Sequence, residues 1–116
     1  LGDGNQVRHY TYGGDLAKGI VTAMEHPDAR NDDFNLSTAQ STTVLELAEV
    51  IWHKIKGPDA PFSVVSDPGF EHDVAKRVPS VDKARDILGF EATTTLDEML
   101  DEVIPWIEKA VADGRI

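Results

Sequence analysis

The sequence predicts a mixed α/β chain with about four helices and about three short strands. Two capping boxes predict helices, because Thr43-Val-Leu-Glu46 and Thr95-Leu-Asp-Glu98 each place a hydroxyl three residues before a carboxylate. Apolar residues recur at helical spacing after both boxes. Short apolar runs lie between the helical segments and predict the strands.

The opening segment predicts a turn followed by a strand. Gly2 to Asn5 contains the residues that tolerate the positive backbone angles of turns. From Val7 the chain is predicted to be extended, so Arg8, Tyr10 and Tyr12 would share one face. A guanidinium beside two phenols forms either a surface cation–π cluster or one wall of an anion site. The residues of this segment alone leave both interpretations open.

A first helix is predicted to follow, with Asp15 as its N-cap and Pro27 marking its end. Its apolar stripe consists of Leu16, Ile20, Ala23 and Met24. The run Asp33-Phe-Asn-Leu36 then predicts a short strand with almost no polar alternation. We therefore expect both faces of this strand to be covered, as at the edge of a larger parallel sheet.

The middle of the chain predicts a helix, a strand and an irregular segment. The helix begins at the first capping box and ends at Gly57-Pro58. Pro61-Phe-Ser-Val-Val-Ser66 predicts the strand. The charged stretch from Asp67 to Arg77 has no helical periodicity, so we expect it to be irregular.

Two further helices are predicted in the last third. Ser80 is the expected N-cap of a short helix that runs through Leu88 and stops at Gly89. The second capping box opens a long helix with Pro105 inside it, where proline removes a hydrogen bond and is expected to cause a kink.

Composition and charge exclude several kinds of function. The net charge of −10 argues against general binding to nucleic acid or to anionic membrane surfaces. A few local arginines can still hold one small anion in an acidic protein. The chain has no cysteine, and its four histidines lack metal-ligand spacing. No apolar run approaches the roughly 20 residues of a membrane span, and a reducing cytoplasm is compatible with this composition.

Five segments, in order along the chain, resemble one known family. They are Gly2-Asp-Gly-Asn-Gln-Val-Arg8 with Tyr10-Thr-Tyr12, Phe34-Asn-Leu-Ser37, Thr43-Val-Leu-Glu-Leu-Ala48, Asp73-Val-Ala-Lys-Arg77, and Val81-Asp-Lys-Ala84 with Leu88-Gly-Phe90. Together they resemble the C-terminal third of the extended short-chain dehydrogenases/reductases (extended SDRs), in particular the NAD-dependent nucleotide-sugar epimerases and dehydratases. The resemblance covers nearly the whole chain.

The resemblance implies a two-part enzyme of which residues 1–116 are the C-terminal substrate-binding portion. The sequence contains neither a Gly-x-x-Gly-x-x-Gly loop nor a Tyr-x-x-x-Lys pair. We therefore expect a separate N-terminal Rossmann domain to bind NAD in the parent enzyme, with no cofactor and no catalytic residue in this portion. The implied partners are a UDP- or dTDP-type nucleotide sugar and that Rossmann domain. The resemblance leaves a homodimeric parent open.

The resemblance also implies four substrate-binding residues. Arg8 matches an arginine that contacts the diphosphate, and Tyr10 matches an aromatic position beside it. Asp73 matches an aspartate that hydrogen-bonds ribose hydroxyls. Arg77 would help to neutralise the diphosphate. The structural alternatives are core packing for Tyr10, a solvated loop carboxylate for Asp73, and an ion pair with Asp73 for Arg77.

The sequence departs from the family pattern at several positions. Phe70-Glu-His-Asp73 stands where many members carry an Arg-Pro-Gly-Asp run, so one anion-binding arginine is replaced. Lys76 replaces the first arginine of a pair, and His9 stands where aspartate is common. A metal at Glu71, His72 and Asp73 is the only candidate cluster and is not expected.

Two other functions remain open on the sequence. One is a reductase or decarboxylase of the same superfamily that acts on another nucleotide sugar. The other is a freestanding binding domain without enzymatic activity. An isolated strand of buried type argues against the second, because a stand-alone domain covers its own sheet edges.

Overall fold

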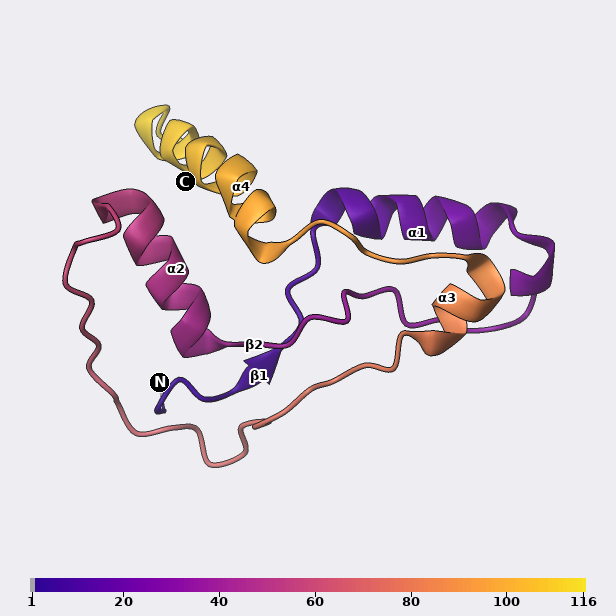
Figure 1. Cartoon of the computed structure of the whole chain (residues 1–116), viewed down its shortest axis with the longest axis horizontal. Coiled ribbons are helices and arrows are strands. Elements are labelled where there is room, and N and C mark those ends of the chain that lie inside the picture. Colours follow the sequence, from indigo (N-terminus) through magenta and orange to yellow (C-terminus); the bar gives the residue numbers. More distant parts are fainter. Residues whose placement is uncertain (1) are drawn as a thin grey trace.

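The computed structural model describes residues 2–116. These residues form two short strands, four α-helices and one 3₁₀ helix (Figure 1). In chain order the elements are β1 (Val7–Arg8), α1 (Gly13–Glu25), the 3₁₀ helix η1 (Pro27–Ala29), β2 (Thr42–Thr43), α2 (Val44–Lys56), α3 (Asp82–Leu88) and α4 (Leu96–Ala112). The predicted mixed α/β class is confirmed.

Strand β1 lies at the centre of a small pairing network. It pairs antiparallel with β2, with Val7 opposite Thr43 and Arg8 opposite Thr42. On the other side Val7 forms an isolated parallel bridge with Lys76. The start of the opening strand at Val7 was therefore predicted correctly, whereas β2 was not predicted, because Thr43 was assigned only to the capping box.

The two other predicted strands are wrong for the residues that the structure describes. Residues 33–36 have no ladder partner there; Phe34 and Leu36 instead pack partly buried against the apolar core. Residues 61–66 are also unpaired, and Val65 is 93% exposed. Apolar side chains alone did not make these segments strands, because a strand also needs a backbone partner.

Helix α1 begins three residues earlier than a cap at Asp15 would allow. Its N-cap is Tyr12, whose side chain makes no capping hydrogen bond, so the prediction of Asp15 as N-cap is wrong. Asp15 is buried in the first turn and accepts a hydrogen bond of 2.8 Å from the backbone N–H of Thr94. The predicted end at Pro27 is confirmed, since α1 stops at Glu25.

The N-terminus of α2 is fully engaged with the opening segment of the chain. The predicted capping box is present between Thr43 and Glu46. The next backbone donors, of Val44 and Leu45, bond the carbonyls of Gln6 and Gly4 at 3.2 and 2.9 Å. Because these donors are already satisfied, they are not available to a phosphate.

Helices α3 and α4 follow the predicted boundaries with one exception. The N-cap of α3 is Val81 and no side chain caps it, so the prediction of Ser80 is wrong; the Ser80 carbonyl instead accepts from Asn35. Gly89 ends α3 with a left-handed φ of 63°. The capping box at Thr95 is present, and Pro105 lies inside α4 as predicted.

A small apolar core joins α1 to α3. Its buried members are Ala84, Leu88 and Phe90. The ring of Phe90 lies against Gly19 of α1, where an added Cβ would come within 2.8 Å of the ring. Figure 1 shows α1 and α3 at one end of the molecule and α2 and α4 at the other, with β1 and β2 between them.

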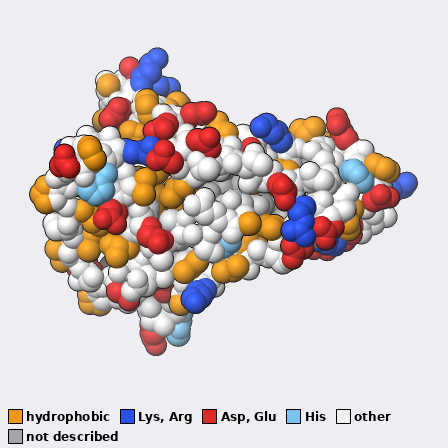
Figure 2. Space-filling model, in the orientation of Figure 1, with side chains coloured by type: hydrophobic (Ala, Val, Ile, Leu, Met, Phe, Trp, Pro, Cys, Tyr) orange, Lys and Arg blue, Asp and Glu red, His pale blue; other side chains and the backbone are white. Residues whose placement is uncertain are grey.

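Much apolar surface remains outside this core. Met24 is 80% exposed and Trp106 is 60% exposed. Figure 2 shows hydrophobic side chains spread over the visible face. No helix within residues 2–116 is long and apolar enough to cross a membrane.

Candidate functional site

The site is built where β1 meets the irregular segment after Asp67. The backbone N–H of Val7 bonds the carbonyl of Ala75 at 2.8 Å, and that of Arg77 bonds the carbonyl of Val7 at 3.2 Å. Gly2 also bonds the carbonyl of Asp67 at 2.8 Å. These backbone bonds place residues from 73 to 77 beside Arg8, although they are more than 60 residues apart in the sequence.

Arg8 is half-buried and held from two sides. One guanidinium nitrogen donates to the Val7 carbonyl at 2.8 Å, and the other reaches the Asp73 carboxylate at 3.5 Å. Asp73 also accepts from the Gln6 amide at 2.9 Å. The ion pair is long, and its side chains retain 28% and 33% of their exposure. Such a pair holds Arg8 weakly, so its donors can turn to a stronger acceptor.

A cavity of about 560 Å³ brings together three of the four predicted residues. Arg8, Tyr10 and Arg77 all line it, so two arginines and a tyrosine contribute to the wall of one space. Val78 and Pro79 supply an apolar part of the wall. The remaining lining residues are His9, Asn35 and Ser37.

A second, smaller cavity also has Arg8 in its wall. It measures about 270 Å³ and is lined by Gln6, Arg8, Val44, Phe70 and Asp73. Asp73, the fourth predicted residue, therefore lies on a different wall from Tyr10 and Arg77. Arg8 lines both cavities, so it stands at their junction.

Polar contacts hold the edge of the larger cavity. His9 Nδ1 lies 2.8 Å from the Thr38 carbonyl and Nε2 lies 3.0 Å from the Ser41 hydroxyl. A carbonyl oxygen only accepts, so Nδ1 carries a proton and donates it. Asn35 donates to the Ser80 carbonyl at 3.0 Å, which ties together two of the segments that contribute to the cavity.

Sequence reasoning missed His9, Asn35 and Ser37 as lining residues. Strict strand alternation assigned His9 to the face opposite Arg8, but β1 ends at Arg8 and the alternation ends with it. Asn35 and Ser37 belong to a segment that carried the family resemblance. That resemblance was the available signal for their position.

Two expected arrangements are not found among residues 2–116. Arg77 does not pair with Asp73, whose carboxylate contacts Arg8 and Gln6 instead. Tyr12 leaves the predicted face and donates a hydrogen bond to Glu102 of α4. This bond, with the nearby charge of Glu102, raises the pKa of Tyr12 above its ordinary value. Within the same residues no group of three His, Cys, Asp or Glu side chains could hold a metal ion.

Comparison with known proteins gives the family. The family model described as GDP-mannose 4,6 dehydratase matches residues 1–103. The chain is 35% identical over 103 residues to UDP-glucuronic acid decarboxylase 1 of Arabidopsis thaliana, which covers 89% of this chain and 22% of that protein. It therefore belongs to the nucleotide-sugar epimerase/dehydratase family of extended SDRs, as the motifs predicted.

Solved structures agree with this assignment. UDP-glucose 4-epimerase of Thermotoga maritima, solved with UDP-glucose, matches with a TM-score of 0.81 and 32% identity over 96% of this chain and 34% of its own. UDP-glucuronic acid 4-epimerase of Bacillus cereus, in complex with UDP-glucuronic acid and NAD, matches with a TM-score of 0.75 and 25% identity. The match covers 94% of this chain and 34% of the epimerase chain. The chain thus spans about a third of the length of these enzymes.

Proposed function

We propose that this chain is the nucleotide-sugar-binding portion of an NAD-dependent nucleotide-sugar epimerase or dehydratase, similar to UDP-glucose 4-epimerase. In this proposal residues 1–116 are the C-terminal substrate-binding portion, and a Rossmann domain of the parent enzyme binds NAD. The homodimeric parent and the cytoplasmic location stay predictions.

The observation that carries the proposal is the convergence of Arg8 and Arg77 on one cavity. Two arginines that line one space in a chain of net charge −10 indicate a local preference for an anion. The volume of about 560 Å³ lies in the usual range of about 300–1,000 Å³ for small-molecule sites. Arg8, at the junction of both cavities, is the best-placed residue for the diphosphate.

The other predicted residues take roles that follow from their chemistry and position. Arg77 supplies a second cation on the larger cavity, and Tyr10 offers a ring face and a hydroxyl beside Arg8. Asp73 is acceptor-only when ionised and lines the smaller cavity, which suits the hydroxyls of a ribose. The nucleoside would thus lie in the smaller cavity, the diphosphate would lie where the two cavities meet between Arg8 and Arg77, and the sugar would occupy the rest of the larger cavity.

The chain would contribute binding energy and alignment rather than chemistry. NAD, when bound, supplies an acceptor for a hydride from the sugar. No Gly-x-x-Gly-x-x-Gly loop is present in these residues, so we assign none of them to NAD. Holding the diphosphate fixes the sugar relative to groups elsewhere in the parent, and such alignment contributes several orders of magnitude in rate.

Decarboxylation of a UDP-sugar acid is the second candidate activity. It is favoured by the 35% identity to the Arabidopsis thaliana decarboxylase. Incubation of the parent enzyme with NAD and UDP-glucuronic acid separates the two activities, because decarboxylation releases carbon dioxide whereas 4-epimerisation retains every carbon. The diphosphate contacts proposed here are compatible with either reaction.

Calorimetric titration with UDP and with UMP tests the proposal. UDP should bind more tightly than UMP, because only UDP carries the diphosphate that Arg8 is proposed to hold. Arg8→Ala should weaken UDP binding by about 10- to 100-fold, the loss expected when a charged hydrogen-bond donor is removed. The preference for UDP over UMP should largely disappear in this variant.

Arg30→Ala is the matched control, because Arg30 is exposed and lies outside both cavities while the charge change is the same. We expect its UDP affinity to stay within about twofold of the unmodified chain. Equal losses in the two variants would show that only net charge matters, and the assignment of Arg8 would be wrong.

A further inference from the structure

Phe70 and Asp73 are the two ends of one tight turn. The backbone N–H of Asp73 bonds the carbonyl of Phe70 at 3.3 Å, which closes a four-residue turn through Glu71 and His72. In such a turn the Cα atoms of the first and fourth residues lie within about 7 Å of each other. The turn therefore places an aromatic ring beside a carboxylate.

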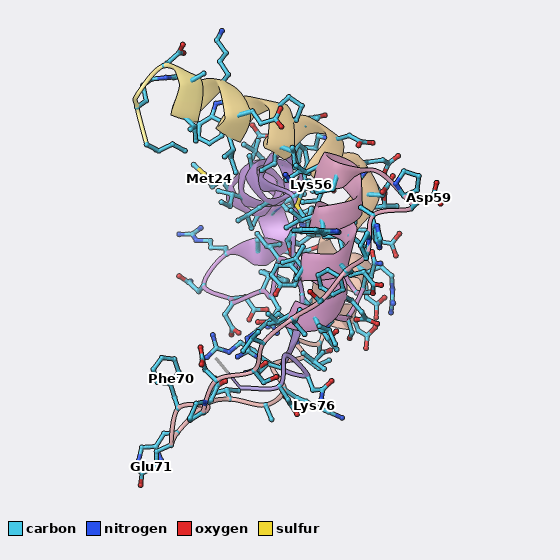
Figure 3. The ribbon with its side chains drawn as sticks, turned by 90° about the vertical axis from the view of Figure 1, so that its left-hand side faces the viewer. Met24, Lys56, Asp59, Phe70, Glu71 and Lys76 are labelled. Atoms are coloured by element: carbon cyan, nitrogen blue, oxygen red, sulfur yellow. The ribbon has the colours of Figure 1, made fainter. Side chains whose placement is uncertain are left out.

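The base of this turn is fixed to the opening segment of the chain. Gly2 bonds Asp67 before the turn, and Val7 bonds Ala75 after it. The Asp73 carboxylate is also held by Gln6. Figure 3 shows the turn projecting from the helical body, with Phe70 and Glu71 on the projecting part.

The ring of Phe70 is exposed and yet lines a cavity. It retains 70% of its exposure, and it forms the wall of the smaller cavity together with Arg8 and Asp73. An exposed apolar ring beside a carboxylate and a guanidinium offers three different contacts in one place. The ring offers a flat apolar face, the carboxylate a hydrogen-bond acceptor, and the guanidinium a cation that can bind an anion.

We propose that Phe70 stacks on the nucleobase of the nucleotide sugar and thereby sets the direction in which the ligand lies. The inference rests on the proposed function, because it takes Arg8 as the diphosphate contact. The base, ribose and diphosphate then meet Phe70, Asp73 and Arg8 in that order. Beyond Arg8 the sugar enters the larger cavity.

Stacking accounts for a departure from the family pattern. The arginine that many members carry at this position holds an anion, which a phenylalanine cannot do. The ring binds any base through its face, since every base has a π-surface. This chain would thus rely less on charge and more on stacking to hold the nucleotide.

Titration of the full chain with UDP and with inorganic pyrophosphate tests the inference. Phe70→Ala should weaken UDP binding by about 5- to 100-fold, the range expected for loss of one stacked base, and leave pyrophosphate binding within about twofold. Phe70→Leu keeps an apolar side chain without a π-face, and it should weaken UDP binding nearly as much. Val65→Ala, at an exposed apolar position outside the smaller cavity, should change neither affinity.

The outcomes separate this inference from the proposed function. Loss of UDP affinity alone in the Phe70 variants supports stacking. Unchanged UDP binding, or equal loss of UDP and pyrophosphate, overturns it while Arg8→Ala still reports on the diphosphate contact. If Arg8→Ala leaves both ligands unaffected, or neither ligand binds the unmodified chain, the proposed function fails and the stacking inference fails with it.

Discussion

At the scale of single residues, Asp15 shows how one buried carboxylate links distant parts of this fold. It accepts a hydrogen bond from the backbone of Thr94, and Lys18 lies 3.6 Å from it. The bond from Thr94, more than the charge of Lys18, holds the pKa of Asp15 below its ordinary value. A pKa lowered by folding means that the ionised group stabilises the folded state.

We expect Asp15→Ala to lower the free energy of unfolding at pH 7 by about 1.5–3 kcal/mol, the usual contribution of a hydrogen bond to a charged group. Because the folded pKa is lowered, this contribution is present above the ordinary pKa of 3.8 and is lost as pH falls through the folded value. Urea unfolding at pH 7 and at about pH 3 measures it. The difference in the free energy of unfolding between Asp15→Ala and the unmodified chain should be smaller at the lower pH.

Asp59→Ala is the control for this measurement, because Asp59 is exposed in the loop after α2. Asp59→Ala should change the free energy of unfolding only slightly at both values of pH. A difference for Asp15→Ala that stays the same at the two values would contradict the proposed role of the ionised carboxylate.

Asp15 also shows which features of the fold could be predicted from the sequence and which could not. An acidic residue near the start of a helix is a local pattern, and it located the beginning of α1 to within three residues. Its partner Thr94 is 79 residues away, and no local pattern indicates such a contact. The approach of Asp73 to Arg8 is equally long-range; only the family resemblance placed both residues at a substrate site.

At the scale of secondary structure, the contact between α1 and Phe90, two residues beyond the end of α3, depends on the absence of a side chain at Gly19. Gly19 is buried in α1, and the Phe90 ring occupies the space where a Cβ would be. Gly13, at the start of the same helix, has nothing within 4 Å of its Cβ position. The two glycines therefore separate packing from helix propensity.

Gly19→Ala should destabilise the chain by about 1–2 kcal/mol, since overpacking commonly costs about 1–3 kcal/mol and outweighs the gain of up to about 1 kcal/mol in helix propensity. Gly13→Ala should be neutral or slightly stabilising. Thermal unfolding of both variants measures this difference. Equal stability changes would show that Phe90 does not pack against α1 as described.

The elements that were predicted best are those defined by local chemistry. Both capping boxes and the glycine after α3 lie within a few residues of the groups they bond, and all three are confirmed. Strand β2 consists of two threonines whose partners lie 34 and 36 residues earlier. Its existence depends on that pairing, so the residues themselves could not predict it.

At the scale of the whole molecule, the fold is more open than a typical domain of its length. Its radius of gyration is 17.1 Å, whereas a compact domain of this length would have about 13 Å. Within residues 2–116 no large side chain is less than 2% exposed. The chain therefore presents apolar surface that it does not cover itself.

We expect the chain to self-associate through this surface. Met24→Lys, at a position that is 80% exposed, should weaken association by about tenfold. Ala17→Lys, at another exposed position of α1, adds the same charge and should have a smaller effect. Sedimentation equilibrium over a range of concentrations measures both. A chain that stays monomeric throughout would contradict this expectation.

We propose that Arg8 and Arg77 face the same bound diphosphate. The side-chain N–H resonances of the five arginines, followed by nuclear magnetic resonance during titration with UDP, test it most directly. We expect saturable shifts for Arg8 and Arg77, with Arg30 and Arg115 unchanged. Shifts of similar size at all arginines, or none at Arg8, would contradict it.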